Sequence, residues 1–143
     1  MRKKEESFRC GFLGVASWCL FDWAHSSFPT VITTFIFSTF FIKSVASNEI
    51  LGTEYWSWAV AISGICIAIL APILGSIADK SKRRKPWLFI LMMITIIGSA
   101  LLYFTDPNTH WIWWALIFYV IANIGYECSQ VFYNALMIGI APK

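Results

Sequence analysis

Two long stretches without a charged residue constrain this chain more than any other feature. They run from Tyr55 to Ala78 and from Pro86 to Thr105, on either side of a short charged loop. A helix rises about 1.5 Å per residue, so each stretch is long enough to cross a hydrocarbon layer about 30 Å thick. The sequence therefore predicts two membrane-spanning helices joined by a tight turn.

The composition points to the same class of protein. Of the 143 residues, 58% are hydrophobic, 17% are aromatic and only 13% are charged, which is too apolar for a soluble domain of this size. Between Cys10 and Ile42 the only formal charge is Asp22, and Trp111, Trp113 and Trp114 open a last apolar stretch as an interfacial aromatic belt. We expect an all-α membrane protein with a single transmembrane domain over residues 1–143. Its four spans are predicted at about 14–42, 55–78, 86–105 and 111–140.

The segments between these spans are short and polar. The first span is long, so we expect it to be tilted, to be kinked at Pro29, or to begin as an interfacial segment. Residues 43–54 and the turn from Asp106 to His110 are predicted to lie outside the membrane. No cleavable signal is evident, so we expect the first span to remain in the mature protein.

The distribution of basic residues sets the orientation. With both termini in the cytoplasm, ten of the eleven basic residues are cytoplasmic and only Lys43 is outside. Basic residues in short loops are retained on the cytoplasmic side. We therefore predict a multi-pass protein with cytoplasmic termini, located in a bacterial inner (plasma) membrane.

Several other functions are disfavoured by the residues present. The net charge of +3 comes from clusters that flank apolar spans, so we expect no nucleic-acid partner. The four cysteines show no metal-binding spacing, and we expect neither a metal nor a cofactor. The two histidines, His25 and His110, lie far apart, and no nucleophile has a neighbouring base. We therefore expect no enzyme.

Polar residues inside the predicted spans are the candidate functional residues. In the fourth span, steps of four, three and four residues place a stripe on one narrow face of a helix. The stripe consists of Asn123, Glu127, Gln130 and Asn134, with Tyr126 and Tyr133 beside it. A second polar face, in the first span, consists of Asp22, His25, Ser26, Pro29 and Thr33.

Each face has two interpretations. The stripe is either a path for a substrate or protons, or a set of hydrogen bonds between helices. Asp22 and His25 lie either on the path or at the membrane interface. Counting from Arg9 and from Pro142 puts Asp22 and Glu127 at similar depth, so they could face one another if the first and fourth spans are neighbours.

The charged loop carries a second kind of signal. It reads Gly75-Ser-Ile-Ala-Asp79-Lys80-Ser-Lys-Arg83-Arg84-Lys85 and places an acid at the end of a helix, where the helix dipole disfavours it. This spacing resembles the loop between helices 2 and 3 of the major facilitator superfamily, with Lys82 at a position where the family usually has glycine. The resemblance implies a gating motif formed by Gly75, Asp79, Lys80, Arg83 and Arg84. It also implies that the chain is the first part of an N-terminal helical bundle.

Two further segments narrow the resemblance to one branch. Residues 17–28, SWCLFDWAHSSF, and residues 131–136, VFYNAL, are similar to segments of the vacuolar amino-acid effluxers and their bacterial relatives. His25 stands where that branch usually has asparagine. The similarity covers nearly the whole chain, yet only about the first third of such a transporter.

The resemblance implies secondary active transport of a small polar solute, with amino acids as candidates and protons as a candidate coupling ion. The alternatives are a four-span scaffold or regulatory subunit that moves nothing, and the inactive product of a truncated gene. In the fold that the resemblance implies, two helical bundles move about a central site, and four helices supply less than one bundle. We therefore expect no transport by the chain alone, and we expect either self-association or a separately encoded remainder.

Overall fold

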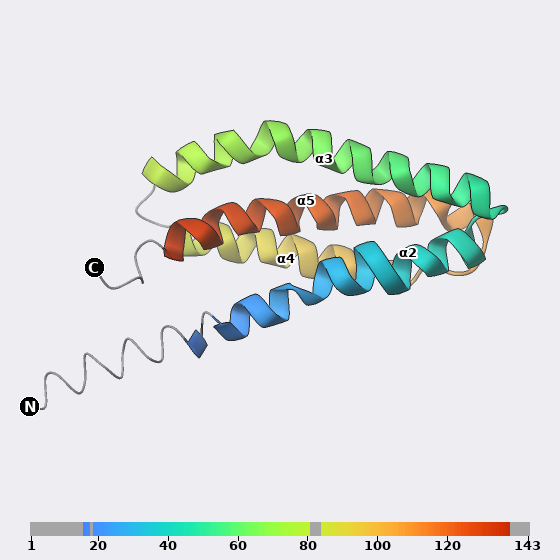
Figure 1. The fold of residues 1–143 in the computed structure, drawn as a ribbon, viewed down its shortest axis with the longest axis horizontal. Coiled ribbons are helices and arrows are strands. Elements are labelled where there is room, and N and C mark those ends of the chain that lie inside the picture. The colour runs from blue at the N-terminus through green and yellow to red at the C-terminus, as the bar shows by residue number, and fades with distance from the viewer. Residues whose placement is uncertain (1–15, 18, 81–83, 138–143) are drawn as a thin grey trace, which may run out of the picture.

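The described part of the chain is a bundle of four long helices (Figure 1). The computed structural model describes residues 16–17, 19–80 and 84–137, and these contain no strand. All four helices are long and apolar enough to cross a membrane. The predicted all-α membrane fold with four spanning helices is therefore confirmed.

The first helix, Cys19–Val45, changes its winding along its length, and we call it helix 1. It is mainly α-helical up to Phe28 and then π-helical over η1 (Pro29–Phe35). Next come α2 (Ile36–Phe40), which is α-helical, and a second π-helical segment, η2 (Phe41–Val45). Proline has no N–H to donate, so the hydrogen-bond ladder must readjust around it. The irregularity predicted at Pro29 is thus a change of winding at that residue.

A tight turn joins helix 1 to the next helix, α3 (Glu49–Lys80). Asn48 caps α3, because its Oδ1 accepts a hydrogen bond from the backbone N–H of Ile50 at 3.1 Å. Gly52 allows the close return of the chain, since a Cβ there would lie 2.8 Å from the Ala46 Cβ. The turn is confined to residues 46–48, and residues 49–54, which were expected in a longer loop, are helical.

The other two helices form a hairpin that packs through small residues. They are α4 (Arg84–Leu102) and α5 (Ile112–Met137), and the turn between them contains the short 3₁₀ segment η3 (Thr109–Trp111). A Cβ at Gly98 would lie 2.8 Å from the Ala122 Cβ, and a Cβ at Gly125 would lie 2.9 Å from Thr95 Oγ1. Backbones approach this closely in membranes when small residues line the contact.

The best-packed region lies at the end of the bundle that holds the turn at 46–48 and the turn before α5. Rings from three helices meet there: Trp56 lies 4.2 Å from Tyr119 and 5.5 Å from Phe41, measured between ring centroids. Val45 and Ala115 belong to the same buried cluster. Helix 1, α3 and α5 are therefore held together most firmly at this end.

Candidate solute path

The polar stripe of α5 lies between the face that contacts helix 1 and the face that contacts α3. We call Asn123, Glu127, Gln130 and Asn134 the α5 stripe. Figure 1 shows α5 running between α3 and helix 1. Ala122 and Gly125 are on the opposite side of α5 and pack against α4. Glu127 and Asn134 are exposed, whereas Asn123 and Gln130 are half-buried, so the stripe is open at two of its four positions.

A continuous stack of rings joins helix 1 to α5 beside the stripe. Its members, in order, are Tyr133, Phe21, His25, Tyr126 and Phe28, with ring centroids 4.9, 5.3, 4.3 and 5.0 Å apart. The stack confirms that the first and fourth spanning helices are neighbours. It also shows that the two helices are antiparallel: Phe21 on helix 1 contacts Tyr133 on α5, whereas Phe28, further along helix 1, contacts Tyr126, which is earlier on α5.

His25 is buried within this stack and does not lie on an open polar face. Its Nε2 is 3.1 Å from the hydroxyl oxygen of Ser129, and that hydroxyl donates to the carbonyl oxygen of Tyr126 at 2.7 Å. Only 7% of His25 is exposed. The histidine is therefore a fixed contact between helix 1 and α5 as well as a candidate for proton transfer.

Two members of the α5 stripe have hydrogen bonds to other side chains. Asn123 donates from Nδ2 to the hydroxyl of Ser63 on α3 at 2.9 Å. Gln130 donates from Nε2 to the hydroxyl of Tyr126, one turn earlier on α5, at 3.3 Å. The bond of Asn123 thus holds α5 to α3, and the bond of Gln130 lies within α5. Among the described residues, the side chains of Glu127 and Asn134 have no hydrogen bond to another side chain.

The two acids of the spans lie at different depths. Asp22 interacts with the side chain of Tyr133, which is six residues further along α5 than Glu127. Six residues of helix correspond to about 9 Å along the axis. The similar depth expected for Asp22 and Glu127 is therefore wrong, because the antiparallel register brings Glu127 closer to the level of His25 and Phe28.

Two hydroxyls near the stripe are buried without a hydrogen-bond partner among the described residues. They are Thr33 Oγ1 on helix 1 and Tyr119 Oη on α5. The two side chains lie close enough to interact, although they miss hydrogen-bond geometry. Leaving a buried polar group unpaired costs about 1–3 kcal/mol, so a small rotation that pairs these two is favourable.

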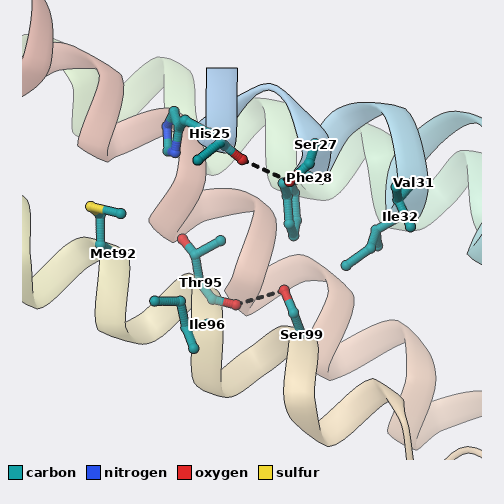
Figure 2. A pocket seen from close by; sticks show the side chains of 10 residues that line it. His25, Ser27, Phe28, Val31, Ile32, Met92, Thr95, Ile96 and Ser99 are labelled. Carbon is teal, nitrogen blue, oxygen red and sulfur yellow. Dashed lines mark hydrogen bonds between the residues drawn. The ribbon is translucent and has the colours of Figure 1, made fainter. Parts of the chain in front are cut away.

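A cavity of about 400 Å³ lies on another side of helix 1, between helix 1 and α4 (Figure 2). His25 and Phe28 line it together with the hydroxyls of Ser27, Thr95 and Ser99. Each hydroxyl donates to a backbone carbonyl of its own helix, at 2.7, 3.2 and 2.7 Å respectively. The cavity wall is mostly apolar, so this cavity fits a helix or lipid chain better than a polar solute.

The loop motif lies largely outside the described part of the structure. Gly75 is described, and a Cβ placed there would lie 3.9 Å from Val131 Cγ1, an ordinary contact distance. Lys80 ends α3 and Arg84 begins α4. The side chains of Asp79, Lys80 and Arg84, and all of Arg83, lie outside the described residues, so the gating motif remains a prediction.

Sequence reasoning did not single out Ser129 and Ser63. Both are fully buried, and each is hydrogen-bonded to a predicted path residue, Ser129 to His25 and Ser63 to Asn123. A buried serine in an apolar helix resembles an ordinary small packing residue, and only the register between helices reveals its partner. The described residues contain no group of three or more histidines, cysteines or acids that could hold a metal ion.

Comparison with known proteins places this geometry in a family. The family model described as "Vacuole effluxer Atg22 like" matches residues 44–141. The uncharacterized MFS-type transporter YxiO of Bacillus subtilis is 34% identical over 130 residues, which cover 89% of this chain and 30% of that protein. The lactose permease of Lactobacillus helveticus is 29% identical over 82% of this chain and 21% of the permease.

A third relative shows the same partial coverage. An uncharacterized protein of Aquifex aeolicus is 27% identical over 80% of this chain and 29% of its own length. The chain thus spans less than a third of each of these relatives. No solved structure matches the chain significantly. With four spanning helices and a family match over residues 44–141, the chain belongs to the Atg22-like vacuole effluxer family and is similar to part of an MFS-type transporter.

Proposed function

We propose that the chain supplies the first four helices of a secondary active transporter for a small polar solute, with amino acids as the candidate class. The α5 stripe and the facing part of helix 1 line the solute path. The observation that carries this proposal is the open position of Glu127 and Asn134 between helix 1 and α3. The family match supports it at the level of transport.

Energetics favour a hydrated path over hydrogen bonding between helices for part of the stripe. A charged side chain at the centre of a membrane helix costs about 2.5–3.5 kcal/mol on insertion scales, so such residues usually face protein or water. Asn123 and Gln130 are already bonded within the bundle. Glu127 and Asn134 have no comparable bond among the described residues, and both need water, a solute or another helix.

Protons are the proposed coupling ion, and Asp22, His25 and Glu127 are the proposed carriers. Asp22 acts electrostatically on His25, one helical turn away. His25 lies near the level of Glu127, because its ring contacts Tyr126 and Ser129 on either side of that residue, and Asp22 lies one helical turn before His25 on helix 1. Carboxyl and imidazole groups of this kind form the proton relays of pumps and transporters.

The proposal includes a gate and an orientation. Asp79 and the cations Lys80, Arg83 and Arg84, with Gly75 before them, form the gating loop on the cytoplasmic side, where both termini also lie. Because the four helices cover less than a third of the relatives, the working transporter needs further helices. These come from the remainder of a longer or separately encoded protein, or from self-association.

Accessibility of introduced thiols tests the path. In a background without the native cysteines, Glu127→Cys and Asn134→Cys should react with a membrane-impermeant thiol reagent when the protein is in its native membrane. Ile121→Cys is the matched control, because Ile121 is exposed on α5 but lies away from the stripe. Labelling of Ile121→Cys as fast as the other two, or no labelling of either stripe position, would contradict a hydrated path. It would favour a scaffold that moves nothing.

A further inference from the structure

Two buried serines share one hydrogen-bonding arrangement at the contacts of α5 with its neighbours. Ser129 donates its hydroxyl to the Tyr126 carbonyl at 2.7 Å, and Ser63 donates to the Val60 carbonyl at 2.8 Å. A serine hydroxyl has a single hydrogen and can donate only once, but its oxygen can still accept. Each of these oxygens can therefore act only as an acceptor toward the side chain of the adjacent helix.

This arrangement fixes the tautomer of His25. The ring atom Nε2 is 3.1 Å from the Ser129 oxygen. The Tyr126 carbonyl is the nearer acceptor, at 2.7 Å, and with the hydroxyl hydrogen directed there the hydrogen of the bond to His25 is the one on Nε2. A neutral imidazole has one N–H and one bare nitrogen, so Nδ1 is left as the acceptor. Ser129 is fully buried, and water therefore does not replace it.

We propose that Ser129 is a positioning residue that holds His25 in the Nε2–H form and makes Nδ1 the atom that takes up and releases the proton. This rests on the proposed function, in which His25 is a proton carrier. Uptake at Nδ1 produces an imidazolium with a hydrogen on each nitrogen. The bond from Nε2 to Ser129 persists in both forms, so the proton can be exchanged without breaking the contact between helix 1 and α5.

The surroundings of the ring suit this role. Asp22 is the charged group of helix 1 that lies near the ring, and Tyr126, Glu127, Cys128 and Tyr133 are the titratable groups on the adjoining part of α5. The side chains that α4 contributes to the shared cavity do not titrate; they are Met92, Thr95, Ile96 and Ser99. The Tyr126 ring, 4.3 Å away, also attracts a cationic imidazolium through its π face.

The same geometry at Ser63 shows that the arrangement is not confined to His25. Asn123 can meet the Ser63 oxygen only with its NH₂ group, which agrees with the observed bond from Nδ2. The Asn123 carbonyl oxygen is thereby left open. Ser129 thus leaves Nδ1 of His25 as an acceptor, and Ser63 leaves the side-chain carbonyl oxygen of Asn123 as an acceptor.

Nitrogen NMR of labelled histidine tests the proposal directly. The chain has two histidines, and His110 is exposed in the turn before α5, so His110→Gln leaves His25 as the single signal. In lipid nanodiscs, neutral His25 should appear as one tautomer with its hydrogen on Nε2. Ser129→Ala should change the tautomer ratio roughly fivefold or more, which is what a neutral hydrogen bond contributes. Ser129→Thr keeps the hydroxyl and should retain the single tautomer.

Ser76→Ala is the matched control for this experiment. Ser76 donates to the carbonyl three residues earlier in the same way, at 2.8 Å, but it is exposed. If Ser129→Ala does not fold, Ser129→Cys supplies a weaker acceptor of similar shape and is read in the same way. A hydrogen on Nδ1 in the unmodified chain, or an unchanged ratio in the Ser129 variant, would overturn the proposal. The measurement needs no solute flux, so its outcome is independent of whether the assembled protein transports.

Discussion

Gly98 of α4 lies directly against Ala122 of α5, where a Cβ at position 98 would come within 2.8 Å of the Ala122 Cβ and 3.2 Å of its Cα. The hairpin of α4 and α5 therefore depends on a missing side chain. Beside this contact, Thr95 reaches from α4 to within 3.4 Å of the Ala122 carbonyl oxygen.

The first prediction concerns this contact. Gly98→Val should force α4 away from α5 and lower the free energy of unfolding by about 1–3 kcal/mol, the usual cost of overpacking. Thermal unfolding of the purified protein in detergent measures the effect. Gly64→Val is the control, because nothing lies within 4 Å of a Cβ at that exposed glycine. Equal unfolding temperatures for the two variants would show that the close approach is not needed.

The second prediction concerns the bond between Asn123 and Ser63. Ser63→Ala should leave the half-buried amide N–H of Asn123 without an acceptor and destabilise the contact of α3 with α5 by about 1 kcal/mol. Adding Asn123→Leu to Ser63→Ala should recover part of this loss, because both polar partners are then removed. A double-mutant cycle on unfolding in detergent measures the coupling. Strictly additive effects of the two substitutions would mean that the two side chains do not interact.

The third prediction addresses the gating loop. Asp79→Asn should leave membrane insertion intact but reduce the maximal transport rate of the assembled protein by about tenfold or more, an effect of about 1.4 kcal/mol on the rate-limiting barrier. The reason is that the proposed gate would lose its one acid. Solute uptake measured over a range of concentrations shows the change. Asp106→Asn, in the turn between α4 and α5, is the matched control, and uptake as fast in Asp79→Asn as in that control would exclude a gating role.

The fourth prediction is that residues 1–143 alone do not transport. The four helices leave Glu127 and Asn134 open and correspond to 30% of the length of the Bacillus relative. Alternating access in transporters of this kind requires two bundles that move against each other. Purified chain reconstituted in liposomes should therefore give no saturable solute flux. Saturable flux without a second polypeptide would show instead that copies of this chain can assemble a complete path.

Much of the fold was predictable from the sequence, because the number of spanning helices depends mainly on the length of uncharged segments. The helix ends were less predictable: residues 49–54 were expected in a loop, yet the Asn48 cap and the tight approach at Gly52 start α3 at Glu49. Polar positions 49, 53 and 54 are compatible with a helix that extends beyond the apolar part of the span.

The site was predictable in its residue types but not in its pairings. The spacing along α5 alone identified the stripe, whereas the partners of His25 and Asn123 depend on how adjacent helices are registered. That register follows from ring stacking and from close contacts at glycine, neither of which appears in the periodicity of one helix. The depths assigned to Asp22 and Glu127 were wrong for the same reason.

The π-helical segment from Pro29 to Phe35 determines which way the beginning of helix 1 points. An α-helix turns by about 100° per residue, and a π turn accommodates additional residues at a similar length of axis. Phe41 and Val45 anchor the later part of helix 1 in the packed end of the bundle. The wider winding therefore sets how the residues of helix 1 before Pro29 are rotated about the helix axis. A helix 1 that was α-helical throughout would turn His25 away from Ser129 and Asp22 away from Tyr133. The direction in which the proposed proton carriers of helix 1 point around the helix axis is therefore set by the winding of the residues that follow Pro29.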